Sequence, residues 1–528
     1  EVAARSPGRY CFCRFFAGLR GQPDEPAAVK SFLLPSAWAL AGALSLLCPA
    51  SPSLAQTTTP AVPKPGVPAA PAELPDTAWA VWEPALPSNY NRAASSAPMR
   101  TVEYVVIHDI EGTAQGCIRW FQDPRAKASS HYVVDGETGK VWQMVKERDV
   151  AWHAGNLDIN RRSVGIEHHG YAYRPGFYDS TLYEASARLV RDITARYNIP
   201  RDRKHIIAHS EVPDPTDPTK FGGRSHHTDP GPYWDWDTLM CLVRNDARLD
   251  GTTFPAVLRP GERAEVSVTF LNLGDDPWPV PATGASGGDE SRIAFAKREP
   301  VYLGVWPAPT GLLAPQQGSL YAPTWNSPRF VGLPAAETDV APGTAARFVF
   351  TVRAPAVAGE TVQQSFRLNR VPVAPRPPVP FGPVVTASVR VEPWDITVGA
   401  DALAAAAPWQ RNGALWWSKA TPEAARWTAT LPLGGEWEVY ARWPAAEGRT
   451  GRATYAVTTA DGGVGSVVVD QREAPGGEGG WRRLGRFSLG RPGVRDQRAE
   501  VRLTATGPGT VVADGLRFVG PFAPGQPR

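Results

Sequence analysis

The chain has 528 residues and a nearly balanced charge, with 55 lysines and arginines against 52 aspartates and glutamates. A chain of this length is expected to fold as three or four domains, each able to bury its own core. The charge forms no basic stripe and no acidic tail, which argues against a nucleic-acid partner. The 50 glycines, 54 prolines and 19 tryptophans favour loop-rich, aromatic β structure in part of the chain.

Residues 1–55 have the pattern of a leader rather than of a folded domain. Lys30 precedes an apolar run at 32–47, and small residues ending at Ala55 match the positions that a signal peptidase reads. The run contains a proline and is too short for a transmembrane helix. We expect a signal peptide at 29–55, with the preceding residues upstream of the true start. We also expect the mature protein to be secreted or periplasmic, with no stable membrane span after cleavage.

The cysteines support an exported protein but leave their own state open. Cleavage after Ala55 would remove three of the five cysteines and leave Cys117 and Cys241. Two alternatives are open for this pair: one disulfide that closes a long loop, or two buried thiols in separate helices. Cys48 is a poor candidate for lipidation, because Leu47 is larger than the residue usual at that position.

A proline, alanine and threonine tract at 56–78 predicts an extended linker. Beyond it, from 79 to 248, short apolar runs alternate with segments of helical periodicity. The expected strands are 103–108, 131–135, 141–145, 164–167 and 205–209, and the expected helices surround Ile118 and cover 182–197 and 237–244. This alternation predicts an α/β domain with a mixed central β-sheet flanked by helices. From 249 onward, alternating strands and Pro/Gly turns predict two all-β sandwich-like modules, at 249–395 and 396–528.

The histidines gather in the α/β domain. All nine lie between His108 and His227, and histidine is the commonest metal ligand and the usual acid or base near neutral pH. His108 and His209 each end an expected strand, and Asp229 precedes a Pro-Gly-Pro turn. Three ligands on strand ends and a rigid turn suit a catalytic zinc site with an open fourth position.

The remaining histidines have weaker claims on this site. In a strand His205 and His209 would lie about 13 Å apart, too far to share a metal. If the segment were helical, His205 would again be a candidate metal ligand, but the β-branched residues between the two histidines favour a strand. Of His168 and His169, at most one faces the site, and a structural or surface role is expected for both. His227, two residues before Asp229, faces the same way as that residue in an extended segment.

Six stretches carry a specific resemblance, in residue types, order and spacing. They are VVIHDIEG (105–112), SSHYVV (129–134), AWHAG (151–155), SVGIE (163–167), IIAHS (206–210) and HTDPGP (227–232). The segment resembles the zinc-dependent N-acetylmuramoyl-L-alanine amidase family, which includes the peptidoglycan recognition proteins. The resemblance implies that His108, His209 and Asp229 bind one zinc ion and that Glu167 is the catalytic glutamate.

One position departs from part of that family, which has lysine where this chain has His227. A protonated imidazole there would stabilise negative charge on the carbonyl oxygen, and activity would fall as pH rises through the His227 pKa.

Five further residues are candidates for substrate binding. We expect His131, Trp152 and His153 to line the peptide groove, with plain packing as the alternative. Asn160 and Ser163 precede the Glu167 strand and are expected to contact the stem peptide, with a solvated loop as the alternative.

The two trailing modules carry resemblances of their own. Residues 249–395 resemble an immunoglobulin-like domain of the four-tryptophan type, through pieces at 270–274, 321–325, 341–343 and 380–382. Residues 396–528 resemble the C-terminal domain of golvesin, through pieces at 437–443, 469–471, 481–485 and 512–518. Trp416, Trp417 and Trp443 are candidates for stacking on sugar rings, although a tryptophan in a β-sandwich more often lies in the core.

These patterns together predict an exported zinc amidase that acts on peptidoglycan. It would hydrolyse the amide between the lactyl group of N-acetylmuramic acid and L-alanine, while the β modules position it and contact glycan. The alternative is a non-catalytic peptidoglycan-binding protein, a class in which the third ligand or the glutamate is typically lost. A second alternative is a surface adhesion protein with a vestigial enzyme.

Overall fold

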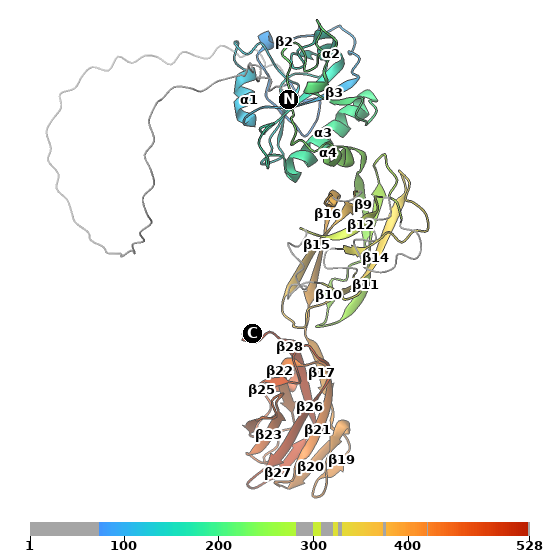
Figure 1. Cartoon of the computed structure of the whole chain (residues 1–528). Helices are drawn as coiled ribbons and strands as arrows, with labels where there is room; N and C mark the ends of the chain where they lie inside the picture. The colour runs from blue at the N-terminus through green and yellow to red at the C-terminus, as the bar shows by residue number, and fades with distance from the viewer. Residues whose placement is uncertain are drawn as a thin grey trace, which may run out of the picture.

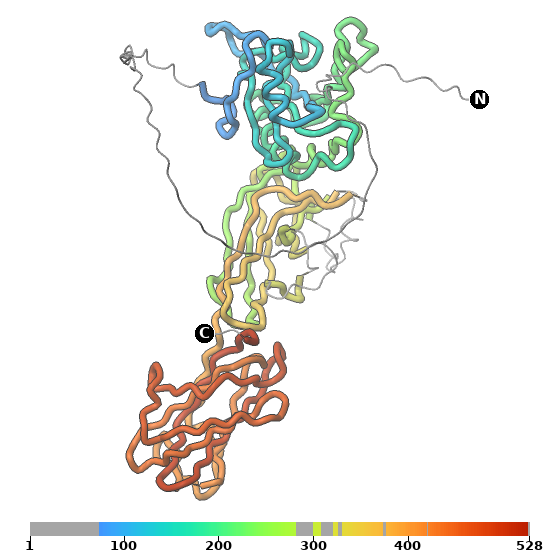
Figure 2. Tube along the Cα trace, turned by 90° about the vertical axis from the view of Figure 1, so that its left-hand side faces the viewer, coloured from blue at the N-terminus to red at the C-terminus, as the bar shows by residue number. Residues whose placement is uncertain are grey.

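The structure is a computed structural model that describes residues 73–280, 299–307, 320–325, 330–372, 376–419 and 421–525. The expected signal peptide and most of the expected linker lie outside these residues. Figure 1 shows three lobes that follow one another in chain order, and Figure 2 shows the same stack from the side. We call them the first lobe (73–246), the middle lobe (247–393) and the third lobe (394–525). In the described ranges, no helix combines the length and apolar character needed to cross a membrane.

The first lobe is built on a mixed sheet, as the sequence predicts. Among the described residues this sheet has six strands in the order β1-β5-β4-β7-β3-β8. They are β1 (Val81–Trp82), β3 (Tyr104–Asp109), β4 (Tyr132–Val134), β5 (Val141–Gln143), β7 (Ser163–His168) and β8 (Ile206–Ala208). Only β4 and β5 pair antiparallel, and the other neighbours are parallel. Parallel strands are covered on both faces, which explains why these strands are short, continuous apolar runs.

Helices flank this sheet, and a small two-stranded sheet lies beside it. The helices are α1 (Ala114–Phe121), α2 (Leu157–Arg162), α3 (Ser180–Tyr197) and α4 (Trp236–Arg244), the 3-10 turns are η1 (Pro87–Asn89) and η2 (His209–Glu211), and the small sheet pairs β2 (Tyr90–Asn91) with β6 (Val150–Ala151). The predicted helix at 182–197 is confirmed as α3. Asp179 caps its N-terminus by accepting from the Leu182 N–H, and Asn198 ends it in the left-handed conformation.

Helix α2 is an element that the sequence analysis did not predict. Its six residues, Leu157–Arg162, lie in a segment for which a solvated loop was the alternative. A helix of this length is too short to show a hydrophobic period. Its one sequence signal is Asn156, which caps the helix by accepting from the N–H groups of Asp158 and Ile159.

The structure settles the two alternatives for the cysteine pair. Cys117 lies in α1 and Cys241 in α4, and both are free thiols. Burial raises the pKa of both thiols, that of Cys241 to about 12. Separate, protonated thiols are therefore the state of this pair, and the disulfide alternative is wrong for this structure.

Two sheets form the described part of the middle lobe. One has the order β10-β16-β15-β12-β13 and the other the order β14-β11-β9. Their strands are β9 (Ala247–Thr252), β10 (Val257–Leu258), β11 (Arg263–Asn272), β12 (Val301–Trp306), β13 (Phe330–Gly332), β14 (Ala345–Arg353), β15 (Thr361–Arg370) and β16 (Val379–Val391). Buried aromatics such as Phe270, Phe348 and Phe366 form a shared core between the sheets. The immunoglobulin-like assignment stays a prediction.

The third lobe is also all β in the residues that the structure describes. Its sheets have the orders β17-β28-β22-β25, β18-β21-β26-β23-β24 and β19-β20-β27. The strands are β17 (Trp394–Val398), β18 (Leu403–Ala404), β19 (Gln410–Asn412), β20 (Leu415–Lys419), β21 (Ala425–Leu433), β22 (Gly435–Arg442), β23 (Ala453–Thr458), β24 (Val464–Val469), β25 (Arg482–Leu489), β26 (Arg495–Ala505), β27 (Thr510–Ala513) and β28 (Gly515–Phe522), with 3-10 turns η3 (Ala400–Ala402) and η4 (Glu478–Gly480).

The structure corrects one of the three tryptophans predicted to stack on sugars. Trp443 is buried in the third-lobe core, and its indole N–H donates to the Glu473 carbonyl. A ring enclosed in this way has no face available to a ligand. Trp416 and Trp417 lie partly exposed on β20, so for them the prediction stands untested.

The first and middle lobes are joined without a linker. Helix α4 ends at Arg244, and β9 begins at Ala247. One hydrophobic cluster continues from the sheet of the first lobe into the core of the middle lobe. Across the junction Arg367 donates two hydrogen bonds of 2.8 Å to the Glu184 carboxylate, and only 8% of the arginine side chain is exposed. These contacts favour a fixed relation between the two lobes.

Replacing Arg367 by alanine is expected to lower the free energy of unfolding of the first and middle lobes by about 2 kcal/mol, because it removes a bidentate, charge-assisted pair at a buried junction. Denaturant unfolding followed by circular dichroism measures this change. Arg376→Ala is the matched control: Arg376 also pairs across the junction, with Asp235, but is half exposed. We expect that control to cost less than about 1 kcal/mol. Equal effects of the two variants would contradict a special role for the buried pair.

Candidate metal centre

The candidate site lies where the central parallel strands of the first lobe end. In the register of β3 against β7, His108 is the partner of Glu167. In the register of β3 against β8, Ile107 is the partner of Ala208, and His209 follows directly in η2. Partners in parallel strands point to the same face of the sheet. The strand register therefore brings two histidines and a glutamate to one place, although they are up to 101 residues apart in sequence.

Asp229 completes a buried cluster with His108 and His209, and their ligand atoms all lie within 4.8 Å of one another. The two Nδ1 atoms are 3.0 Å apart. The Asp229 carboxylate oxygens lie 3.2 Å from His108 Nδ1 and 3.1 Å from His209 Nδ1. Ligands around a tetrahedral metal with bonds near 2.0 Å are separated by about 3.3 Å, so these spacings fit such an ion. Asp229 Oδ1 is also buried without a hydrogen-bond partner, as expected of an atom reserved for a cation.

A chain of hydrogen bonds behind His108 determines which of its nitrogens is free. The Ser163 hydroxyl donates its one proton to the Ile159 carbonyl at 2.6 Å, so its oxygen must accept from His153 Nε2, 3.2 Å away. His153 Nδ1 then carries no proton and accepts from His108 Nε2 at 3.0 Å. This leaves a lone pair on His108 Nδ1, the atom that faces His209 and Asp229. Outer partners that fix a ligand's tautomer in this way are a general feature of metal sites.

Close packing holds in place this relay, by which we mean the hydrogen bonds that run from Ser163 through His153 to His108. The His153 ring lies over Gly165 of β7, where an added Cβ would stand 2.5 Å from the ring. The Asn160 side-chain oxygen accepts from the backbone N–H groups of His153 and Ala154, at 3.2 and 2.8 Å. Glycine at 165 and asparagine at 160 are therefore part of what positions His153.

The electrostatics give the cluster the protonation states of metal ligands. Burial lowers the pKa of His108 to about 4, with a further contribution from His209, so His108 is neutral at pH 7. Burial alone would raise the pKa of Asp229, but His209 and His108 together hold it well below its usual value. A neutral imidazole and an ionised carboxylate are the forms that bind a divalent cation.

Glu167 lies beside the cluster, opposite His108 in the neighbouring strand. In the described part of the chain its side chain has no hydrogen-bond or ion-pair partner. Burial raises its pKa well above the usual glutamate value, and the Asp229 and Asp109 carboxylates raise it further. A partly exposed carboxylate with a raised pKa is suited to taking up and giving back a proton.

His227 lies next to the cluster but on its outer side. Its ring stacks on that of His209, with centroids 4.5 Å apart, and its Nδ1 is 3.6 Å from Asp229 Oδ1. About half of its side chain is exposed (48%). Burial and the neighbouring His209 lower its pKa below the usual value. The expected cationic role is therefore disfavoured at neutral pH, where His227 is a neutral hydrogen-bond donor.

Three of the five predicted substrate contacts are corrected by burial. His131 and Ser163 have no exposed surface and Asn160 only 6%, and all three are hydrogen-bonded to protein groups. A side chain enclosed in this way supports the site rather than touching a ligand. His153 is also nearly buried, at 8%, within the relay. Trp152 is partly exposed and remains a candidate wall of a groove.

The other histidines form hydrogen bonds or ion pairs with protein groups outside the cluster, as expected for structural roles. His168 bridges the His108 carbonyl and the Ser186 hydroxyl, both at 2.8 Å. The rest pair with aspartates at 2.7 to 3.0 Å: His169 with Asp135, His205 with Asp202 and His226 with Asp214.

Sequence reasoning missed Asp109 and Tyr178. The Tyr178 hydroxyl lies within hydrogen-bond distance of Asp109 Oδ2, at 2.7 Å, and of the Pro230 carbonyl oxygen, at 3.1 Å, which ties the loop after β7 to the Asp229 turn. Burial raises the pKa of Asp109 to about 7. The only sequence signal was the position of Asp109 directly after His108, because Tyr178 lies in a loop whose path the sequence does not indicate.

Comparison with known proteins finds matches for two parts of the chain. Residues 98–232 match the N-acetylmuramoyl-L-alanine amidase family, and residues 410–520 match the golvesin C-terminal domain. The chain is 35% identical over 176 residues to N-acetylmuramoyl-L-alanine amidase A of Achromobacter lyticus, which covers 31% of this chain and 93% of that protein. It is 28% identical over 167 residues to N-acetylmuramoyl-L-alanine amidase AmiD of Escherichia coli (strain K12), covering 28% of this chain and 55% of that protein.

Among solved structures, the chain resembles the catalytic domain of XlyA with 22% sequence identity and a TM-score of 0.20. That similarity covers 25% of this chain and 83% of the other.

Replacing Ser163 by alanine is expected to weaken zinc binding by roughly tenfold or more, because it removes the acceptor that fixes the tautomers of His153 and His108. Competition with a chromogenic chelator measures the affinity. The matched control is Ser130→Ala, since Ser130 is equally buried but donates only to the Tyr132 carbonyl. Unchanged zinc affinity in Ser163→Ala would show that the relay does not govern the ligand.

Proposed function

Because the chain belongs to the N-acetylmuramoyl-L-alanine amidase family, we propose that it is an exported, zinc-dependent enzyme that acts on peptidoglycan. Its reaction is hydrolysis of the amide between the lactyl group of N-acetylmuramic acid and the L-alanine of the stem peptide. The observation that carries the proposal is the buried His108, His209 and Asp229 cluster with the partnerless Glu167 carboxylate beside it. The family match supplies the substrate class, and the geometry supplies the groups that the chemistry needs.

The three ligands suit zinc by their chemistry as well as their spacing. Two imidazoles and one carboxylate leave a fourth tetrahedral position open, which is the pattern of catalytic rather than structural zinc. When bound, zinc would supply a Lewis acid that polarises the scissile carbonyl and lowers the pKa of water to about 7. The carboxylate of Asp229 preserves more of that acidity than a thiolate would.

Glu167 moves the proton in the proposed reaction. Because its pKa is raised, Glu167 holds a proton more readily than an ordinary glutamate, so it can accept the proton of the attacking water and then donate it. The recipient is the departing amine of L-alanine, which is a poor leaving group until it is protonated. A carboxylate held by hydrogen bonds to the protein would be less able to perform both transfers.

His227 is proposed to stabilise the charge that develops on the carbonyl oxygen. Its exposed side chain can reach a substrate above the cluster, while stacking on His209 fixes its plane. Since its pKa is lowered, it acts as a neutral N–H donor at neutral pH. The activity should then persist above the His227 pKa, in contrast to the expectation for a cationic histidine.

A non-catalytic peptidoglycan-binding protein is the alternative function. Such a protein needs neither a ligand triad with an ionised carboxylate nor a second carboxylate with a raised pKa beside it. The presence of Asp229 in the buried cluster and of Glu167 opposite His108 supports hydrolysis. The enzymatic function therefore accounts for more of the observed geometry. Export rests on the leader pattern at 29–55, and action outside the cell fits a substrate located in the wall.

Cleavage of purified muropeptides, followed by chromatography and mass spectrometry, tests the function directly. We expect the full chain to release the stem peptide and leave a free lactyl carboxylate. A chelator should abolish the release, and added zinc should restore it. Intact substrate in the presence of stoichiometrically bound zinc would contradict the enzymatic proposal and favour the binding protein.

Glu167→Gln is expected to lower kcat by roughly 100- to 10,000-fold, because the amide has the same shape but cannot carry the proton. Metal content, measured by atomic absorption, should stay unchanged, since Glu167 is not among the three ligands. Glu137→Gln is the matched control, on the exposed turn between β4 and β5. Loss of zinc in Glu167→Gln would instead assign Glu167 as a ligand.

A further inference from the structure

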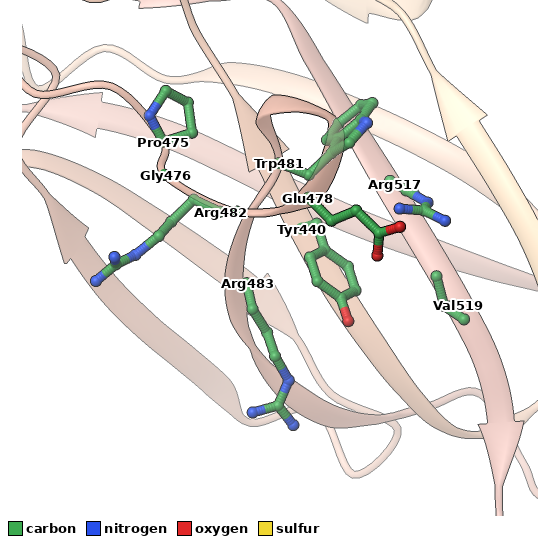
Figure 3. Close-up of a pocket in the computed structure, with 10 residues that line it drawn as sticks. Tyr440, Pro475, Gly476, Glu478, Trp481, Arg482, Arg483, Arg517 and Val519 are labelled. Atoms are coloured by element: carbon green, nitrogen blue, oxygen red, sulfur yellow. The ribbon is translucent and has the colours of Figure 1, made fainter. Parts of the chain in front are cut away.

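A second concave site lies on the third lobe, outside the amidase region. It is a cavity of about 420 Å³ on the outer face of the β22, β25 and β28 sheet, under the loop 475–480. Figure 3 shows Tyr440 between Arg483 and Arg517, with Trp481 and Glu478 on the loop above them. A cavity of this size is in the range of small-molecule sites and suits one or two sugar rings.

The floor of the cavity is held rigid by a buried carboxylate. Glu438 has no exposed surface and accepts the Tyr440 hydroxyl at 2.6 Å. It also accepts from Arg483 at 3.0 Å and forms an ion pair with Arg486 at 3.7 Å. One buried carboxylate thus fixes a phenol ring and two guanidinium groups before any ligand arrives, which is the arrangement expected of a preorganised site.

The conformation of the loop over the cavity depends on its glycines. Pro475 is followed by Gly-Gly-Glu-Gly-Gly and then Trp481. A Cβ on Gly477 would stand 1.9 Å from the Trp481 carbonyl oxygen, so no larger residue fits there without moving the loop. The close approach places the partly exposed Trp481 ring at the cavity wall, where Arg442 stacks on it at 4.9 Å.

The lining combines two features that together select a ligand class. The partly exposed Trp481 offers aromatic surface, which packs against the apolar face of a sugar ring, while Glu478 and the arginines offer acceptors and donors for its hydroxyls. Three of the arginines around the cavity have a carboxylate partner: Arg517 pairs with Asp395, Arg442 with Asp514 and Arg483 with Glu438.

Arg482 is a further guanidinium at this cavity. It is exposed at the cavity rim and has no carboxylate partner in the part of the chain that the structure describes. Guanidinium groups present forked donors that match a carboxylate, and a guanidinium already bound at one edge keeps donors at the other. We propose that this cavity is a binding site for a sugar that carries a carboxylate.

Two sources have that chemistry: N-acetylmuramic acid with a free lactyl group, and the uronic acids of acidic polysaccharides. The inference does not depend on the proposed amidase activity, because it concerns a different lobe and an equilibrium of binding. If both hold, the third lobe would recognise the sugar that the first lobe has freed from its peptide, and would keep the enzyme on glycan already processed.

Isothermal titration of the full chain with three sugars tests the proposal: N-acetylmuramic acid, D-glucuronic acid and neutral N-acetylglucosamine. We expect at least one of the acids to bind roughly tenfold more tightly than N-acetylglucosamine, the contribution of one charge-assisted contact. Binding of N-acetylmuramic acid alone identifies wall glycan as the source, and binding of glucuronic acid alone identifies an acidic polysaccharide. Equal binding of the neutral sugar, or no binding of any, overturns the proposal.

Variants assign the binding to this cavity rather than to the first lobe. Arg482→Ala and Trp481→Leu should each weaken acid-sugar binding by roughly fivefold to tenfold. The matched control is Arg411→Ala, an exposed arginine on β19 of the same lobe, which should bind as the parent does. Muropeptide cleavage by all three variants should equal that of the parent. Unchanged sugar binding in both cavity variants would overturn the assignment whatever the cleavage result, so failure of this proposal is separate from failure of the amidase proposal.

Discussion

Two imidazole nitrogens and a carboxylate converge at 3.0 to 3.2 Å in a buried position, and the first lobe is arranged to hold them there. Electron-rich atoms at such distances repel one another unless a cation lies between them, so the surrounding fold has to supply the restraint. The register of β3 against β7 and β8 supplies part of it. The hydrogen bonds from Ser163 through His153 add to this restraint, because they determine which nitrogen of His108 carries the proton.

The same constraint explains residues whose roles are otherwise obscure. Gly165 has no side chain because the His153 ring occupies that space. Asn160 is buried in α2 because its oxygen satisfies the two backbone N–H groups that lead into the relay. Tyr178 contacts both Asp109 and the turn that carries Asp229, so the loop between β7 and α3 helps to position the Asp229 carboxylate. The geometry of the cluster therefore depends on the residues packed around it as well as on its three members.

The two β lobes extend this rigid design over the length of the molecule. The first and middle lobes share a continuous hydrophobic cluster and a buried Arg367–Glu184 pair. The middle and third lobes meet where the Ala358 N–H donates to the Pro521 carbonyl and Arg495 donates to the Gly261 carbonyl. The elements that carry the candidate metal centre belong to the first lobe, and those that line the cavity belong to the third lobe, at the other end of the stack (Figure 1).

The sequence by itself determined the α/β class of the first lobe, the β character of the other two and the three residues of the cluster. Strand periodicity is local, and the family-like motifs record chemistry residue by residue, so both can be read without coordinates. The roles of Asn160, Ser163 and His131 could not be read in this way, because burial depends on what packs against a residue from elsewhere in the chain. Only the tertiary structure decided that they support the site, that the two cysteines stay apart and that Trp443 lies in a core. The physical reason is the same in each case: these outcomes depend on contacts between segments far apart in sequence, and no local pattern encodes them.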